Sequence, residues 1–173
     1  MYFYKVHQGF TSQIFDLMIL KEDLQAAVEG QRKSLSKIKG LTQREALAKF
    51  SPTSTHIEVI TGVRRSGKST LMRQIIEETT TDFAFLNFED PRIFDFEIGD
   101  FPKLDELFGE EVSIYFFDEI QNVKGWEVFV RQLHDRGRKV FITGSNASLL
   151  SSELGTKLTG RHLSHEILPF SYS

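Results

Sequence analysis

One short segment, residues 62–70, combines residue types and spacing that suit phosphate binding. It matches the pattern G-x-x-x-x-G-K-[ST], in which two glycines let the backbone N–H groups turn inward around phosphate oxygens. Lys68 would reach the β and γ phosphates, and the Ser69 hydroxyl would coordinate Mg²⁺. The predicted phosphate-binding residues are Gly62, Val63, Arg64, Arg65, Ser66, Gly67, Lys68, Ser69 and Thr70.

The sequence on either side of this segment favours a phosphate-binding role over a chance match to the pattern. An apolar run, residues 57–61, precedes it, and a helical pattern follows from Ser69, so the helix N-terminus adds a positive dipole end to the site. Arg64 and Arg65 either touch phosphate or face solvent, and we favour solvent for at least one. The sequence lacks the Asn-Lys-x-Asp motif that reads guanine, so we expect ATP with Mg²⁺ as the ligand.

Two adjacent carboxylates follow a second apolar run, residues 113–117. Asp118 would hold Mg²⁺, usually through water, and Glu119 would polarise the water that attacks the γ phosphate. A simple turn is the alternative for an isolated Asp-Glu pair. A kinase for a small molecule needs an acceptor pocket and a lid, whereas a hydrolase needs a base at this position, so hydrolysis is favoured.

Other polar residues follow neighbouring apolar runs. Asn146 or Ser145 would sense the γ phosphate, or one of them would cap the next helix, and both alternatives stay open. Asn87 would orient Glu119, while the two carboxylates after it, residues 89–90, are equally typical of a solvated turn. These groups are expected at the carboxyl ends of parallel strands, where ligands bind in such sheets.

Arg161 and Trp126 are candidates of a different kind. Arg161 precedes the last apolar run and would stabilise transition-state charge, in its own chain or in a neighbouring subunit, or else lie in a surface turn. Trp126 begins a helical pattern, and core packing is favoured over base stacking.

Short apolar runs alternate with amphipathic segments after His56. Expected strands are residues 57–61, 83–87, 113–117, 140–143 and 162–168. Expected helices are residues 69–79, 103–108, 126–136 and 147–154. This alternation predicts right-handed βαβ units and a parallel sheet covered by helices on both faces.

The first part of the chain has a different character. Helical spacing covers residues 13–28, a polar Lys-rich stretch covers 29–40, and a short helical pattern covers 42–50. Breakers at 51–55 predict a boundary between a helical lead-in, residues 1–55, and an ATPase core, residues 56–173. The abrupt end after the last strand indicates the N-terminal part of a longer protein, with a short natural terminus as the alternative.

Composition narrows the possible partners and compartments. A formal net charge of −3 does not support nucleic-acid binding, and the absence of cysteine removes disulfides and thiolate metal sites. The five histidines lack metal-ligand spacing. No run is long enough to span a membrane and no signal peptide is visible, so we expect a cytoplasmic protein.

Five motifs in order carry a resemblance to a known family. They are Ile60–Thr70, Asn87–Asp90, Phe117–Gln121, Ile142–Asn146 and Leu158–Arg161. The chain resembles, over about residues 43–173, the prokaryotic and especially archaeal AAA-type ATPases whose ATPase domain precedes a C-terminal domain of unknown function.

The resemblance implies a three-layer α/β/α sandwich of the P-loop NTPase class with sheet order 5-1-4-3-2. It implies Asp118 and Glu119 as the Walker B pair and Asn146 or Ser145 as the first sensor. Asn87 would couple to the catalytic Glu119, and Arg161 would be a finger or sensor arginine. The helical lid and C-terminal domain of such ATPases are not seen in the sequence.

These observations predict an ATPase domain that hydrolyses ATP with Mg²⁺ to drive or gate a conformational change. A slow-turnover switch that binds ATP or ADP is the alternative, and a small-molecule kinase is a weaker one. The expected partners are further copies of this chain in a homo-oligomer, or another protein that binds through a further C-terminal region.

Overall fold

The computed structural model describes residues 18–36, 47–48, 50, 54–144 and 157–169. Its helices are α2 (Lys21–Leu35), α3 (Lys68–Glu78), α4 (Phe101–Phe108) and α5 (Trp126–Asp135). Its strands are β1 (Ile57–Thr61), β2 (Phe83–Asn87), β3 (Ile114–Asp118), β4 (Lys139–Gly144) and β5 (His162–Glu166). Short 3₁₀ turns are η2 (Pro91–Ile93), η3 (Ile98–Asp100) and η4 (Ile120–Asn122).

The strands form one parallel five-stranded sheet in the order β5-β1-β4-β3-β2. This is the predicted order 5-1-4-3-2. Register brings the carboxyl ends of neighbouring strands together, since Thr61 pairs with Gly144 and Asn87 pairs with Asp118. The edge of the sheet that carries these ends is therefore the edge at which polar side chains meet.

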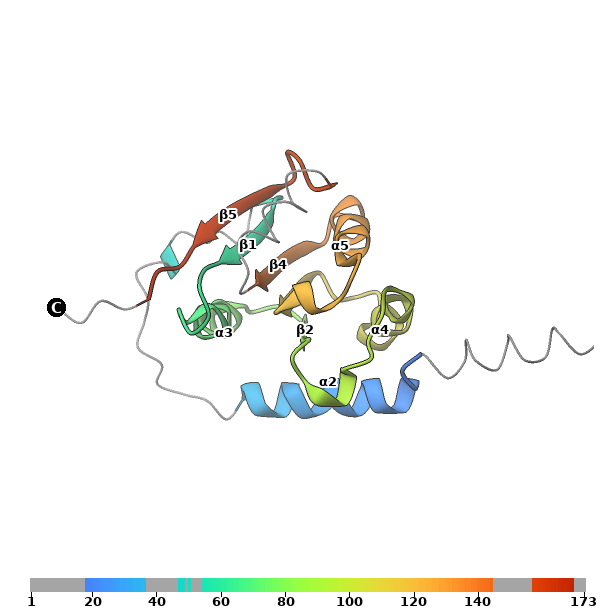
Figure 1. Ribbon diagram of the computed structural model, residues 1–173. Coiled ribbons are helices and arrows are strands. Elements are labelled where there is room, and N and C mark those ends of the chain that lie inside the picture. The colour runs from blue at the N-terminus through green and yellow to red at the C-terminus, as the bar shows by residue number, and fades with distance from the viewer. Residues whose placement is uncertain (1–17, 37–46, 49, 51–53, 145–156, 170–173) are drawn as a thin grey trace, which may run out of the picture.

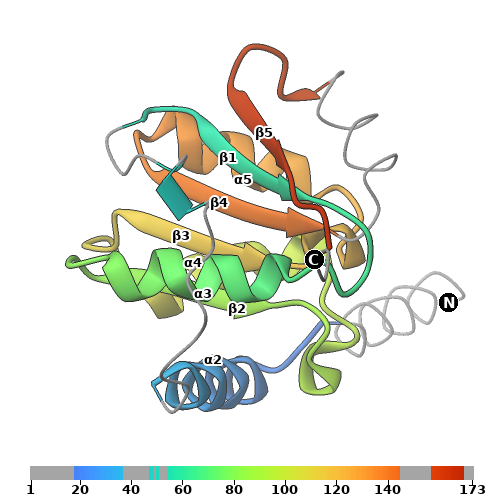
Figure 2. The ribbon, with the colours of Figure 1, turned by 90° about the vertical axis from the view of Figure 1, so that its left-hand side faces the viewer.

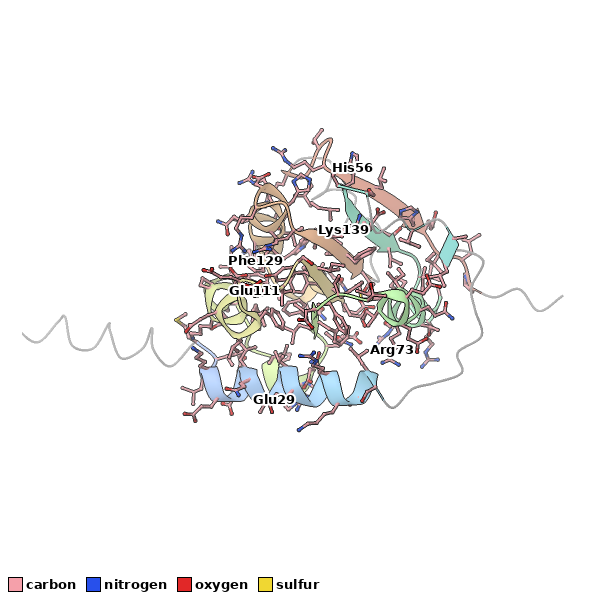
Figure 3. The ribbon with its side chains drawn as sticks, turned by 180° about the vertical axis from the view of Figure 1, so that it is seen from behind. Glu29, His56, Arg73, Glu111, Phe129 and Lys139 are labelled. Atoms are coloured by element: carbon pink, nitrogen blue, oxygen red, sulfur yellow. The ribbon has the colours of Figure 1, made fainter. Side chains whose placement is uncertain are left out.

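Helices cover both faces of the sheet, so the fold is the predicted α/β/α sandwich. Helix α3 covers one face, and α4 and α5 cover the other (Figures 1 and 2). In Figure 3, Arg73 of α3 and Phe129 of α5 lie on opposite sides of the sheet. Phe116 and Phe117 point to different faces, as alternation along a strand requires, and each belongs to a separate apolar core.

Aromatic side chains fill both cores. Phe101 and Phe129 stack on the α4 and α5 side with ring centroids 4.3 Å apart, and Phe116 stacks on Phe141 on the α3 side at 4.8 Å. Trp126 is fully buried in the first core, which confirms its predicted packing role.

Helix α2 lies along the β2 edge of the sheet (Figures 1 and 2) and contacts β2, η2 and α4. Its apolar side, Leu24 and Ala27, is buried in the same core as α4 and α5. The structure therefore places an N-terminal segment directly against the sheet.

The predicted elements after residue 56 are confirmed within two residues at each end, wherever they are described. The first helix differs: the predicted range was 13–28, whereas α2 begins at Lys21 and continues to Leu35. It continues because Gln, Arg and Lys are good helix formers and Gln31 is buried. The predicted helix 147–154 lies outside the described residues, as does most of the pattern at 42–50. The boundary at 51–55 stays a prediction.

None of the helices in the described part of the chain is long and apolar enough to cross a membrane.

Candidate functional site

The phosphate loop leads from the carboxyl end of β1 to the first turn of α3, and its backbone requires both glycines. Gly62 has a φ of 149°, and a Cβ atom there would lie 2.4 Å from the backbone oxygen of Ile167. Gly67 adopts the left-handed conformation, with a φ of 89°, and caps α3. Glycine is the residue that adopts such backbone conformations without steric cost.

Lys68, the first residue of α3, folds back over the loop. It is buried, and its Nζ donates to the carbonyl oxygens of Gly62 and Val63, both at 3.2 Å. The same Nζ lies 3.8 Å from Oε1 of Glu119. The ammonium group therefore lies between the loop backbone and the predicted catalytic carboxylate.

The two arginines of the loop lie on the surface of the protein. Arg64 and Arg65 are both exposed, and Nη2 of Arg64 lies 4.0 Å from Oε1 of Glu89. The expectation that at least one of the two faces solvent is thus confirmed.

Asp118, at the end of β3, is a buried carboxylate held by three donors. Its Oδ1 accepts hydrogen bonds from Oγ of Ser69 at 3.2 Å and from Oγ1 of Thr143, and its Oδ2 accepts from Nδ2 of Asn87 at 3.2 Å. Burial raises the pKa of Asp118 above its ordinary value, while the hydrogen bonds from Thr143 and Ser69 act in the opposite direction. Such a carboxylate has a fixed orientation.

Glu119 follows in a left-handed conformation, with a φ of 53° and a ψ of 46°. That conformation costs a residue other than glycine about 1 kcal/mol, and such strain is often found at functional sites. The turn brings the Glu119 carboxylate to Lys68 on one side, while its Oε2 accepts a hydrogen bond from Nε2 of Gln121 at 2.6 Å on the other.

Thr143 is a site residue that the sequence analysis missed. It is fully buried near the end of β4, where its hydroxyl donates to Asp118 and accepts the backbone N–H of Glu119 at 2.9 Å. The expected sheet order sets β4 beside β3, so it predicts that a polar side chain at the end of β4 lies next to Asp118. Thr143 is the polar side chain at the carboxyl end of β4.

Asn87 contacts a different carboxylate from the expected one. We predicted that it would orient Glu119, whereas its Nδ2 donates to Asp118. The reason lies in the register of β2 and β3, which pairs Asn87 directly with Asp118.

Arg161 lies at the opposite end of the sheet from the phosphate loop. It precedes β5, whose first residue pairs with Ile57, the first residue of β1, and about 13 Å of strand separates this end from Thr61. Its Nε lies 3.6 Å from Oδ1 of Asp135 on the surface. A catalytic contact within its own chain therefore does not fit this geometry. Ser145 and Asn146 lie outside the described residues.

The oxygen atoms at this site fit a magnesium ion that arrives with a nucleotide. Ser69 and Asp118 offer a hydroxyl and a carboxylate 3.2 Å apart, and both are hard oxygen ligands. In the described part of the chain, no group of three or more acidic or histidine side chains could hold a metal by itself. Mg²⁺ is usually held by one or two carboxylates together with substrate phosphates, which is the arrangement offered here.

A glycine-bounded loop between β1 and α3, two carboxylates at the end of β3 and the sheet order 5-1-4-3-2 define a P-loop NTPase domain of AAA type. The family model described as "AAA domain" matches residues 54–173. The chain belongs to this family of nucleotide-binding ATPase domains.

Two curated relatives share part of their length with this chain. An uncharacterized protein of Methanocaldococcus jannaschii is 46% identical over 122 residues, which cover 67% of this chain and 27% of the relative. An uncharacterized protein of Haemophilus influenzae is 38% identical over 142 residues, covering 74% of this chain and 34% of the relative. The chain thus spans about a third or less of the length of these relatives.

Solved structures that match part of this chain include AMPPCP-bound DnaA from Aquifex aeolicus and PCH-2 from C. elegans. DnaA matches with a TM-score of 0.43 and 12% identity, over 71% of this chain and 43% of its own. PCH-2 matches with a TM-score of 0.42 and 14% identity, over 90% of this chain and 45% of its own.

Proposed function

We propose that this domain binds ATP with Mg²⁺ and hydrolyses it, and that hydrolysis drives or gates a conformational change in an attached region or partner. The observation that carries the proposal is the approach of Lys68 to Glu119 beside the Ser69–Asp118 pair. In this proposal Lys68 binds phosphate, Glu119 is the general base, and Ser69 and Asp118 are the metal ligands. All four lie at the same end of the sheet, beside the phosphate loop.

Each residue then has a defined task. The loop N–H groups cradle the triphosphate, and Lys68 exchanges the carbonyl groups of Gly62 and Val63 for phosphate oxygens. As Lys68 turns to phosphate, Glu119 is left to orient and polarise the attacking water. Asn146 remains our candidate for sensing the γ phosphate.

Ser69 and Asp118 would hold Mg²⁺, Asp118 through water. When bound, the ion neutralises charge on the β and γ phosphates. Thr143 and Asn87 keep the Asp118 carboxylate in place for this role.

Arg161 is proposed to act across a subunit boundary. Its position at the far end of the sheet supports a role toward a neighbouring copy of this chain, with a residue of a surface turn as the alternative. The site is then completed by assembly, in which regions outside this chain take part.

The test is ATP turnover over a range of protein concentrations, with and without Mg²⁺. Glu119→Gln should bind a fluorescent ATP analogue as the wild type does and lose at least about a hundredfold in turnover, the usual minimum for a lost general base. Glu89→Gln, the same change at an exposed carboxylate near the loop, is the matched control and should hydrolyse normally.

Turnover at the wild-type rate in Glu119→Gln would contradict the role of that residue. A wild-type protein that binds no nucleotide would overturn the whole proposal. Nucleotide binding without turnover would instead support a slow ATP/ADP switch.

A further inference from the structure

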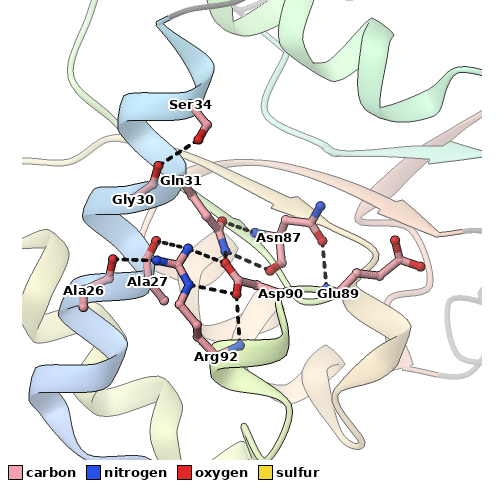
Figure 4. A network of polar contacts seen from close by, with 9 residues as sticks. All are labelled: Ala26, Ala27, Gly30, Gln31, Ser34, Asn87, Glu89, Asp90 and Arg92. Atoms are coloured by element: carbon pink, nitrogen blue, oxygen red, sulfur yellow. Dashed lines mark hydrogen bonds and ion pairs between the residues drawn. The ribbon is translucent and has the colours of Figure 1, made fainter.

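One side chain of α2 bonds to the edge strand as a neighbouring strand would. Oε1 of Gln31 accepts the backbone N–H of Asn87 at 2.8 Å, and its Nε2 donates to the carbonyl oxygen of Asn87 at 3.1 Å (Figure 4). The second hydrogen of Nε2 goes to Oδ2 of Asp90 at 2.8 Å. Gln31 is buried, and both hydrogens of its amide are used.

Asn87 extends this contact into the nucleotide site. Gln31 holds the backbone of Asn87. The side chain of Asn87 is oriented by a local turn, in which Oδ1 of Asn87 accepts the backbone N–H of Glu89 at 2.8 Å. With Oδ1 engaged, Nδ2 donates to Oδ2 of Asp118. The proposed magnesium carboxylate is therefore connected to α2 through a single intervening residue.

A second contact fixes α2 at the same place. The Arg92 guanidinium donates to the carbonyl oxygens of Ala26 and Ala27, at 3.1 and 3.4 Å, while it also binds Asp90. Gly30 leaves room for it, because a Cβ atom there would lie 2.6 Å from Nη1 of Arg92. Figure 4 shows both contacts on adjoining turns of α2. The position of α2 and the position of Asn87 are thus set together.

We infer that Gln31 is a positioning residue for the Mg²⁺ site, which acts through Asn87 on Asp118, and that α2 thereby controls Mg²⁺-dependent nucleotide binding. This inference rests on the proposed function and assigns a regulatory role to the N-terminal helix. Partners that orient a metal ligand typically change metal affinity ten- to a hundredfold when removed. Gln31 acts one residue further away, so its effect belongs at the lower end.

The experiment measures equilibrium binding of a fluorescent ATP analogue, both in EDTA and over a Mg²⁺ titration. Gln31→Met keeps the side-chain length and removes the hydrogen bonds. We expect the Mg²⁺ concentration for half-maximal enhancement of binding to rise about tenfold, with binding in EDTA changed less than about twofold. Gln25→Met, the same change at an exposed position of α2, is the control and should match the wild type.

A double mutant isolates the connection. Asn87→Ala retains the backbone groups that Gln31 binds and removes the side chain that reaches Asp118. In that background Gln31→Met should shift the Mg²⁺ dependence no further, whereas an additional full shift would overturn the inference. A purely structural role would lower the melting temperature and weaken binding in EDTA and in Mg²⁺ alike, which would also overturn it.

Two outcomes separate this inference from the proposed function. If the wild type binds no nucleotide, the proposed function fails. If the wild type shows Mg²⁺-dependent binding that Gln31→Met leaves unchanged, the inference alone fails. Should Gln31→Met not fold, Gln31→Glu serves instead, because it keeps one acceptor while setting an oxygen against Asp90, and it should shift the Mg²⁺ dependence in the same direction.

Discussion

A single hydroxyl group contacts both acidic residues of the candidate site. Thr143 receives the backbone N–H of Glu119 and donates to the side chain of Asp118, so it fixes both the strained turn and the proposed metal ligand. Because Thr143 is fully buried, bulk water has no direct access to replace its hydroxyl if it is lost.

Thr143→Val tests this joint role with a side chain of nearly the same shape. We expect the free energy of unfolding to fall by about 1–3 kcal/mol, since buried polar groups lose their partner, and Mg²⁺-dependent nucleotide binding to weaken. Denaturant unfolding and nucleotide titration measure the two effects, and Thr143→Ser, which keeps the hydroxyl, should restore both. A valine variant equal to the wild type in both measurements would remove Thr143 from the site.

The sequence predicted the site residues where they share one stretch of chain. Lys68 and Ser69 belong to the contiguous phosphate-loop pattern. Asp118 directly follows an apolar run, which is where the carboxylate partner of a phosphate loop is expected. The roles of Thr143 and Gln31 were not found in this way. Thr143 belongs to the Ile142–Asn146 motif, but its contact with Asp118 crosses from β4 to β3, and Gln31 contacts Asn87 from outside the sheet.

At the scale of elements, the contact between α2 and η2 contains an ion pair with its own pH dependence. The hydrogen bond from Arg92 lowers the pKa of Asp90 to about 2, with burial acting against it and Gln31 assisting. The folded-state pKa lies below the ordinary value of 3.8, so this carboxylate stabilises the fold above pH 4 or so and loses that contribution as the pH falls toward about 2.

Asp90→Asn should therefore be less stable than the wild type at pH 7, and the difference should shrink as the pH falls from about 4 to about 2. Melting temperatures followed by circular dichroism across this range measure the effect. Asp95→Asn, at an exposed position nearby, should show no such convergence. A constant gap between wild type and Asp90→Asn at every pH would show that the charge of Asp90 is not what holds α2.

Elements with one dominant period could be predicted closely, and α2 could not. The strands of the sheet are apolar runs bounded by turns, so their ends are visible in sequence. The second half of α2 is polar, and Gln31 within it is held against β2 by hydrogen bonds to the backbone of Asn87. These contacts exist only after the sheet has formed.

At the scale of the whole molecule, Arg161 provides a test of assembly. Its surface contact with Asp135 is of a kind worth less than about 1 kcal/mol, so Arg161→Ala should leave the melting temperature nearly unchanged. We expect turnover per molecule to match the wild type at low concentration and to fall below it where the protein assembles.

Sedimentation and turnover measured on the same samples decide this prediction. Arg131→Ala, at an exposed position of α5, is the control for loss of a surface charge. An equal loss of activity at every concentration would place Arg161 in its own chain's site, and no loss at any concentration would leave it a surface residue.

The contact between α2 and β2 also determines where the chain can be truncated without exposing the edge of the sheet. The family match begins at residue 54, yet the outer edge of β2 is bonded to a residue 23 positions earlier, Gln31. A chain shortened to the family match would present backbone N–H and C=O groups of β2 as a template for strands of other molecules. The helix thus protects this edge of the sheet, and a shortened chain that keeps the protection begins at or before Lys21.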